Sequence, residues 1–139
     1  MRHAFTVIEL ALTLCILSIL SAIAMPWAGK LLDRVHVRAA VVQIESLFGS
    51  ARHIAIARAT QTTVDIDTAA QTIYVSVGLD TLRKGKIGAD HDVQLSASRV
   101  RMSYSATGIG YGAANLSVFV RRSSAADTVF VSRLGRLRH

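Results

Sequence analysis

The hydrophobic pattern divides the chain into a long helical stretch and a β-rich remainder. Residues 10–29, between Glu9 and Lys30, carry no charge and are rich in Leu, Ile and Ala. Twenty residues of α-helix span ~30 Å, the thickness of the hydrocarbon core of a bilayer. The pattern therefore predicts a helix that can cross a membrane once.

Helical spacing continues beyond this apolar run. We expect one nearly continuous helix over residues 5–58, with lipid or neighbouring helices around its first half and a domain core against its second half. Pro26 removes one backbone hydrogen bond and should kink this helix near the membrane surface. The expected core stripe recurs every three or four residues, with a slip of one step after Val42; it comprises Leu32, Val35, Ala39, Val42, Ile44, Leu47, Phe48, Ala51, Ile54 and Ala55.

From residue 60 onward, apolar and polar positions alternate in the manner of β-strands. Residues 68–71 predict a hairpin turn, the charged run 80–92 an exposed loop, and the glycine-rich run 108–115 a bend. The chain should thus be an α+β protein, in which a long N-terminal helix packs through its second half on an antiparallel β-sheet of about six strands. Five of the expected strand segments lie near residues 63–67, 73–77, 93–104, 116–120 and 128–134.

Glu9 is a carboxylate placed inside the apolar run. A charge at the centre of a membrane helix costs roughly 2.5–3.5 kcal/mol, and less near the interface, so such a residue needs a partner. If the chain is cut between Ala4 and Phe5, the new amino group of Phe5 lies four residues before Glu9. Positions i and i+4 share a helix face, so amine and carboxylate can neutralise each other within one subunit or between two.

This N-terminus resembles the class III signal of type IV prepilins and pseudopilins. The basic leader Met1–Ala4 is followed by Phe-Thr-Val-Ile-Glu-Leu and the apolar run, although Ala4 stands where the family nearly always has Gly. The resemblance implies that a prepilin peptidase cleaves between Ala4 and Phe5 and methylates the amine of Phe5. It implies a leader at 1–4, a transmembrane and assembly helix at 5–29, and a periplasmic pilin-like domain at 30–139, with an amphipathic helix at 30–58 and a β-sheet at 62–139.

Two simpler interpretations remain open for the N-terminal segment. One is an ordinary secretory signal peptide with Ala22-Ile23-Ala24 as its cleavage site. The other is a generic single-pass anchor. Both leave Glu9 unexplained.

The order of elements and the ending Gly-Arg-Leu-Arg look like the GspH/FimT group of minor pseudopilins. The resemblance implies a non-enzymatic subunit, anchored in the bacterial inner membrane, that joins other pilins or pseudopilins in a type II secretion pseudopilus or a type IV pilus. FimT-like members are implicated in binding incoming DNA through a GRxR motif, which here is Gly135, Arg136 and Arg138, with Arg133 close by. The alternative function is therefore a DNA-binding minor pilin for natural transformation.

The charge distribution bears on this alternative. The formal net charge is +7, and residues 71–139 carry ten Lys or Arg against four Asp or Glu. Such a surface attracts polyanions or merely keeps a small domain soluble. In an extended chain Arg136 and Arg138 point to the same side ~7 Å apart, and seven further cations are candidates to widen the patch. No aromatic residue interleaves with the tail arginines, so we expect salt-sensitive binding without base stacking. The seven further cations that are candidates to widen the patch are Arg83, Lys84, Lys86, Arg99, Arg101, Arg121 and Arg122.

The sequence offers little for catalysis or metal binding. The five histidines show no metal-ligand spacing, Asp90-His91-Asp92 falls short of a coordination sphere, and the single cysteine, Cys15, lies in the apolar run. We therefore expect no enzymatic activity, no cofactor, no metal and no intramolecular disulfide.

Overall fold

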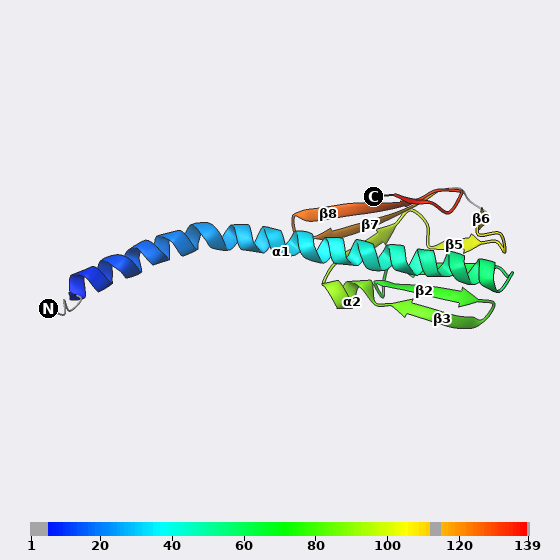
Figure 1. The fold of residues 1–139 in the computed structure, drawn as a ribbon, viewed down its shortest axis with the longest axis horizontal. Coiled ribbons are helices and arrows are strands. Elements are labelled where there is room, and N and C mark those ends of the chain that lie inside the picture. The colour runs from blue at the N-terminus through cyan, green and yellow to red at the C-terminus, as the bar shows by residue number, and fades with distance from the viewer. Residues whose placement is uncertain (1–5, 112–114, 139) are drawn as a thin grey trace. The chain divides into compact units, whose positions relative to one another are not determined.

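The structure is a computed structural model that describes residues 6–111 and 115–138 (Figure 1). It contains one long helix, one short helix and nine strands within those residues, and the chain divides into two compact units at residue 32/33. The elements are α1 Val7–Ala57, β1 Thr62–Asp67, β2 Thr72–Val77, β3 Asp80–Gly85, α2 Ile87–His91, β4 Gln94–Ala97, β5 Arg101–Tyr104, β6 Gly110–Tyr111, β7 Leu116–Arg122, β8 Ala125–Val131 and β9 Leu137–Arg138.

The predicted long helix is confirmed as α1. Thr6 begins it, since its Oγ1 accepts a hydrogen bond from the Glu9 amide at 3.3 Å. Thr6-x-x-Glu9 is the sequence of a capping box, a helix-start signal that is independent of the apolar periodicity. Pro26 lies inside α1, and the kink at this residue stays a prediction.

The second half of α1 packs on the sheets with a different face from the one predicted. Val37, Ala40, Val41 and Ile44 are buried and continue without a slip into the later part of the stripe, which runs through Leu47, Phe48, Ala51 and Ala55. The predicted positions Leu32, Val35, Ala39 and Val42 are exposed. This part of α1 carries two parallel apolar stripes, one exposed and one buried. The prediction combined the first residues of the exposed stripe with the last residues of the buried stripe.

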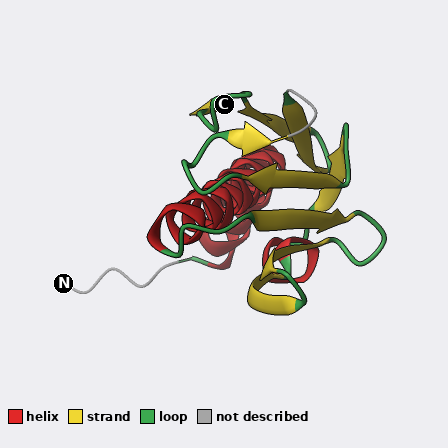
Figure 2. Ribbon diagram, turned by 90° about the vertical axis from the view of Figure 1, so that its right-hand side faces the viewer, coloured by secondary structure: helices red, strands yellow, loops and turns green. Residues whose placement is uncertain are grey.

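The strands form two antiparallel sheets rather than the one expected. Their orders are β3-β2-β1-β5-β6 and β4-β7-β8-β9, and Figure 2 shows the strands around the second half of α1. The expected single strand at 93–104 breaks at residues 98–100, so that β4 and β5 belong to different sheets. The hairpin turn at 68–71 is confirmed, with the Asp67 carboxylate accepting hydrogen bonds from the amides of Ala69 and Ala70.

The predicted exposed loop at 80–92 is wrong. It contains edge strand β3, which pairs with β2, and the short helix α2. Charged side chains on an edge strand face solvent and protect it from pairing with other chains, so charge density alone did not indicate a loop. Ile87 and Val93 are buried and fix this segment to the core. The bend predicted at 108–115 contains β6, and residues 112–114 lie outside the described ranges.

Candidate functional site

The N-terminal half of α1 has the surface expected of a membrane helix. Every residue from Thr6 to Leu32 is exposed, including Val7 and Trp27, and the helix is long and apolar enough to span a bilayer. The hydroxyls of Thr13 and Ser18 donate to backbone carbonyls of the preceding turn at 2.8 and 2.7 Å. Their polar groups are thus satisfied inside the helix, as a segment in lipid requires.

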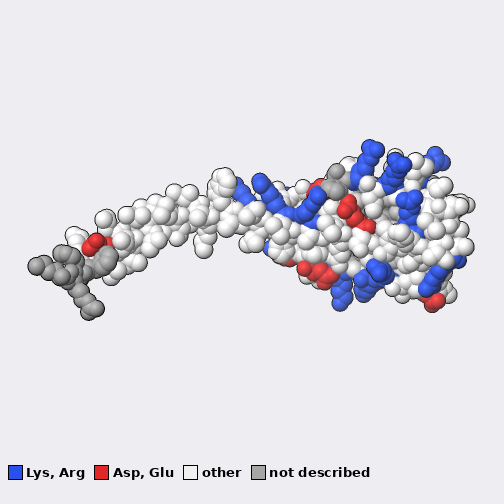
Figure 3. All heavy atoms as spheres, viewed as in Figure 1, with Lys and Arg blue, Asp and Glu red and all other residues white. Residues whose placement is uncertain are grey.

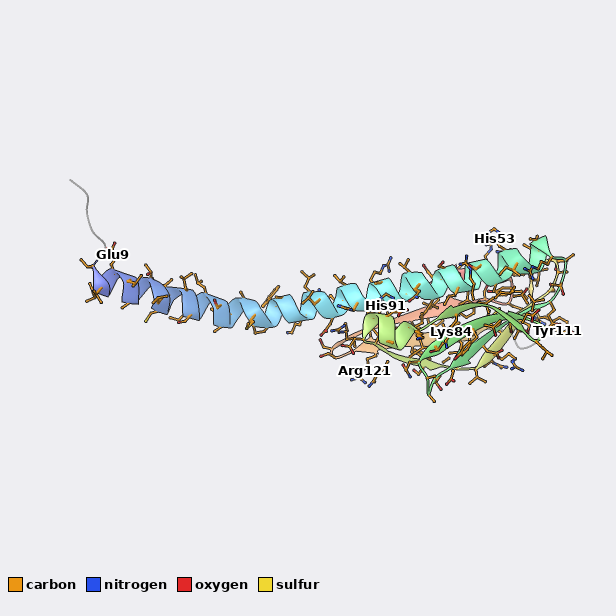
Figure 4. All side chains as sticks on the ribbon, turned by 90° about the horizontal axis from the view of Figure 1, so that it is seen from below. Glu9, His53, Lys84, His91, Tyr111 and Arg121 are labelled. Atoms are coloured by element: carbon orange, nitrogen blue, oxygen red, sulfur yellow. The ribbon has the colours of Figure 1, made fainter. Side chains whose placement is uncertain are left out.

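Glu9 lies in the first turn of α1, at the end labelled in Figure 4. A carboxylate is favourable there because the unpaired amides and the helix dipole place a partial positive charge at this end. The residues of the predicted cleavage, Ala4 and Phe5, lie outside the described residues. The pairing of Glu9 with the Phe5 amine therefore stays a prediction.

Gly135 has a structural reason to be glycine. Its φ is +72°, and an added Cβ would lie 2.9 Å from Tyr104 Cε1 and 3.1 Å from the Gly108 carbonyl oxygen. A left-handed conformation and this close approach both exclude a side chain. The surrounding turn is closed by two backbone hydrogen bonds of 2.8 Å, in which the Gly135 amide donates to Ser132 and the Ser132 amide donates to Arg136.

This turn presents the tail arginines to solvent. Arg133, Arg136 and Arg138 are exposed, and no carboxylate in the described ranges forms an ion pair with any of them. Arg138 belongs to β9 and lies opposite Phe130 of β8. Arg136, Arg138 and Phe130 line one surface groove of about 520 Å³. The sequence alone did not show that strand pairing brings an aromatic ring beside these arginines.

Several of the other candidate basic residues make contacts outside the tail. Figure 3 shows Lys and Arg side chains on several parts of the domain. Arg101 pairs with Asp65, whose hydrogen bond raises the pKa of the guanidinium. Arg122 pairs with Asp33 at 3.0 Å and Asp92 at 3.3 Å. Among the remaining candidates Arg83 donates to Ser50, Lys84 lies over the Tyr74 ring, and Arg121 extends from β7.

The acidic and histidine cluster around α2 is occupied by structural contacts. His91 Nε2 lies 2.7 Å from Gln43 Oε1, and Gln43 Nε2 donates to Asp90 at 3.2 Å. The His91 carbonyl meets His36 Nδ1 and the Arg122 guanidinium, at 2.9 and 3.0 Å. In the described part of the chain no group of three or more His, Cys, Asp or Glu residues is arranged to hold a metal. This cluster joins α1, α2 and β7.

The Tyr104 ring packs against the turn that contains Gly135. Its side chain is fully buried, and burial raises the pKa of its hydroxyl to about 12, with the nearby Arg52 charge acting in the opposite direction. The hydroxyl has no hydrogen-bond partner within the described residues. Its ring is the surface on which Gly135 packs.

Comparison with known proteins identifies the fold. In sequence, the chain matches no protein-family model and has no significant match among curated proteins. In structure, it is similar to the type IV minor pilin FimU of Pseudomonas aeruginosa in two crystal forms, at 12% identity in each. The TM-score is 0.66 over 76% of this chain and 89% of FimU in space group P21, and 0.61 over 73% and 90% in space group P65. The chain therefore has the fold of a type IV minor pilin.

Proposed function

We propose that this chain is a non-enzymatic minor pilin or pseudopilin, anchored in a membrane by the first half of α1 until it joins a filament of similar subunits. The proposal rests on the two different halves of α1. Its exposed, apolar first half continues into a helix that forms the core of a minor-pilin domain. An unpartnered apolar helix needs lipid or other helices, and a filament subunit uses both in turn.

The proposed assembly step uses Phe5 and Glu9. A prepilin peptidase removes Met1–Ala4 on the cytoplasmic face of the bacterial inner membrane and methylates the new Phe5 amine, while the C-terminal domain lies in the periplasm. The positive amine and Glu9 then form a charge pair as apolar helices pack together. Because breaking a buried pair costs about 3–5 kcal/mol, this pairing selects the axial position of a subunit.

Substitution of Glu9 tests this step. We expect Glu9→Leu to insert in the membrane but to be absent from sheared filaments, with incorporation measured by immunoblot. Thr13→Leu is the matched control, because it replaces a polar residue one turn further along the same helix face with Leu and should assemble normally. Mass spectrometry should show a mature chain that begins with methylated Phe5. A start at Met25, an intact Met1, or normal assembly of Glu9→Leu would contradict the proposal.

The filament is that of a type II secretion system or a type IV pilus, and the tail favours a second candidate function, DNA binding during uptake. Arg133, Arg136 and Arg138 are exposed without ion-pair partners in the described structure, and Gly135 holds the turn that presents them. Backbone phosphates would bind such arginines without sequence readout.

Charge-matched variants test this candidate. The full chain in a non-ionic detergent should bind duplex DNA with an affinity that falls as salt rises. Arg136→Gln with Arg138→Gln should weaken binding, whereas Arg34→Gln with Arg58→Gln removes the same charge from exposed sites outside the candidate patch and should weaken it less. If the two double variants lose the same amount of DNA affinity, binding depends only on net charge, and the Gly-Arg-Leu-Arg motif is not the contact.

A further inference from the structure

The outer face of the β4-β7-β8-β9 sheet carries an unexpected pair of aromatic residues. Strands β7 and β8 alternate between the core and solvent, with Val118, Val120 and Val129 buried. On the opposite face Phe119 and Phe130 are 44% and 52% exposed. Phenylalanine has no polar group that favours an exposed position. Two neighbouring exposed rings are therefore a candidate binding surface.

The strand register places these two rings next to each other. Phe119 lies opposite Thr128, and Phe130 lies opposite Ser117. The phenylalanines are therefore diagonal neighbours on adjacent antiparallel strands, with Cα atoms ~7–8 Å apart. Phe119 has small neighbours on the same face, since Ser96 of β4 and Thr128 of β8 lie opposite it. These neighbours leave the exposed part of the Phe119 ring open to a flat ligand.

Arginines lie at both ends of the aromatic pair. Arg121 is two residues along β7 from Phe119, on the side of the domain away from α1 (Figure 4). At the other end Arg138 lies opposite Phe130. Asp127 of β8 is directed to the other face, where its carboxylate lies 4.0 Å from Arg38 of α1. The outward positions of the four described strands thus combine cations and aromatic rings without a carboxylate.

We propose that this face binds single-stranded nucleic acid. Two consecutive bases stack on Phe119 and Phe130, while Arg121 and Arg138 contact the flanking phosphates and Arg136 extends the contact along the groove. Stacking on aromatic side chains beside a positively charged track is how proteins bind single strands without sequence preference. In a duplex the base faces are already stacked on each other and do not reach the rings. The expectation of binding without base stacking, drawn from the sequence, is replaced by this proposal.

This face shares Arg136 and Arg138 with the tail candidate, which is the proposed binding of duplex DNA by the C-terminal arginines. Single-strand binding depends in addition on Phe119 and Phe130. An apolar protein partner would not need the line of arginines, and an acidic peptide would not need the rings. The combination fits a ligand that repeats a flat apolar group and an anion, as a single strand does.

The test compares labelled oligothymidine with a duplex of the same length, using the full chain in a non-ionic detergent and fluorescence anisotropy. We expect Phe119→Leu with Phe130→Leu to lower single-strand affinity roughly thirtyfold or more, because each of the two lost stacking contacts is worth about fivefold or more, and to leave duplex affinity unchanged. Tyr111→Leu removes an aromatic that is 69% exposed on the other sheet, and it should change neither affinity. Phe119→Trp keeps an aromatic ring and should retain single-strand binding, which separates lost stacking from lost folding.

The outcomes separate this inference from the tail candidate. Unchanged single-strand affinity in Phe119→Leu with Phe130→Leu, an equal loss in Tyr111→Leu, or full displacement by polyglutamate at equal charge would overturn the proposal. If Arg136→Gln with Arg138→Gln leaves duplex affinity intact while the phenylalanine variants lose the single strand, the tail candidate fails and the sheet face stands. If the protein binds only duplex DNA and this binding depends on Arg136 and Arg138, the sheet-face proposal fails and the tail candidate stands.

Discussion

At the scale of single residues, Gly135 connects the tail to the core. Its position against the Tyr104 ring gives the glycine of the Gly-Arg-Leu-Arg ending a role in folding, whatever the arginines bind. The sequence alone shows only that a glycine stands in this ending. It did not predict the contact with Tyr104, because residues 104 and 135 are far apart in the sequence and only the folded chain brings them together.

Gly135→Ala should destabilise the domain by about 1–3 kcal/mol, because it adds both a strained left-handed conformation and a clash. Gly49→Ala is the control: it lies in α1, and a methyl group added there would meet no atom within 4 Å, so Ala should be neutral or slightly stabilising. Urea unfolding of the full chain in detergent, followed by circular dichroism, measures both. Equal stability of the two variants would show that the turn relaxes around the methyl group.

Tyr104 should ionise at a higher pH than an ordinary tyrosine, because its side chain is buried. Its pKa is raised to about 12, so between about pH 10 and pH 12 the unfolded chain loses a proton that the folded chain keeps. The stabilisation is complete below about pH 10 and is lost as the pH rises through about 12, by up to about 2–3 kcal/mol. A titration of tyrosinate absorbance should show a late step that disappears in Tyr104→Phe. A late step that persists in Tyr104→Phe would assign it to another tyrosine.

At the scale of elements, α1 shows what hydrophobic periodicity determines and what it leaves open. It predicted the helix and its length, since both apolar stripes have helical spacing. It did not choose between the stripes, because burial depends on which face the sheets cover. The same limit applies to the strands: alternation predicted most of them, but the division into two sheets depends on pairing between distant residues. Edge strand β3 was missed because its solvent-facing charges are typical of a loop.

Two adjacent valines test the assignment of the core stripe. Val41 is fully buried and Val42 is 55% exposed. Val41→Ala should lower the free energy of unfolding by about 2 kcal/mol, because it removes buried methyl groups and leaves a cavity. Val42→Ala makes the same chemical change on the exposed face and should shift it by no more than about 0.5 kcal/mol. The opposite order, in a denaturant titration, would restore the stripe predicted from the sequence.

At the scale of the whole molecule, the apolar half of α1 is long enough to anchor the protein in a membrane, which predicts how the protein behaves in a cell extract. We expect the full chain to stay with the membrane fraction in high salt and in alkaline carbonate and to be released by non-ionic detergent, since apolar contact rather than charge holds it. An immunoblot of the fractions measures this. Release by salt alone would mean that the basic domain, and not α1, attaches the protein to the membrane.

The ion pairs of Arg122 with Asp33 and Asp92 have a mechanical consequence. Asp33 is the first residue of the C-terminal unit, and Arg122 ties it to Asp92 and to the His91 carbonyl. A pulling force that travels along α1 from its N-terminal side enters this unit at Asp33. The load is therefore shared at once with α2 and β7, before it reaches the apolar contacts between α1 and the sheets, and the helix resists being peeled away from the rest of the unit.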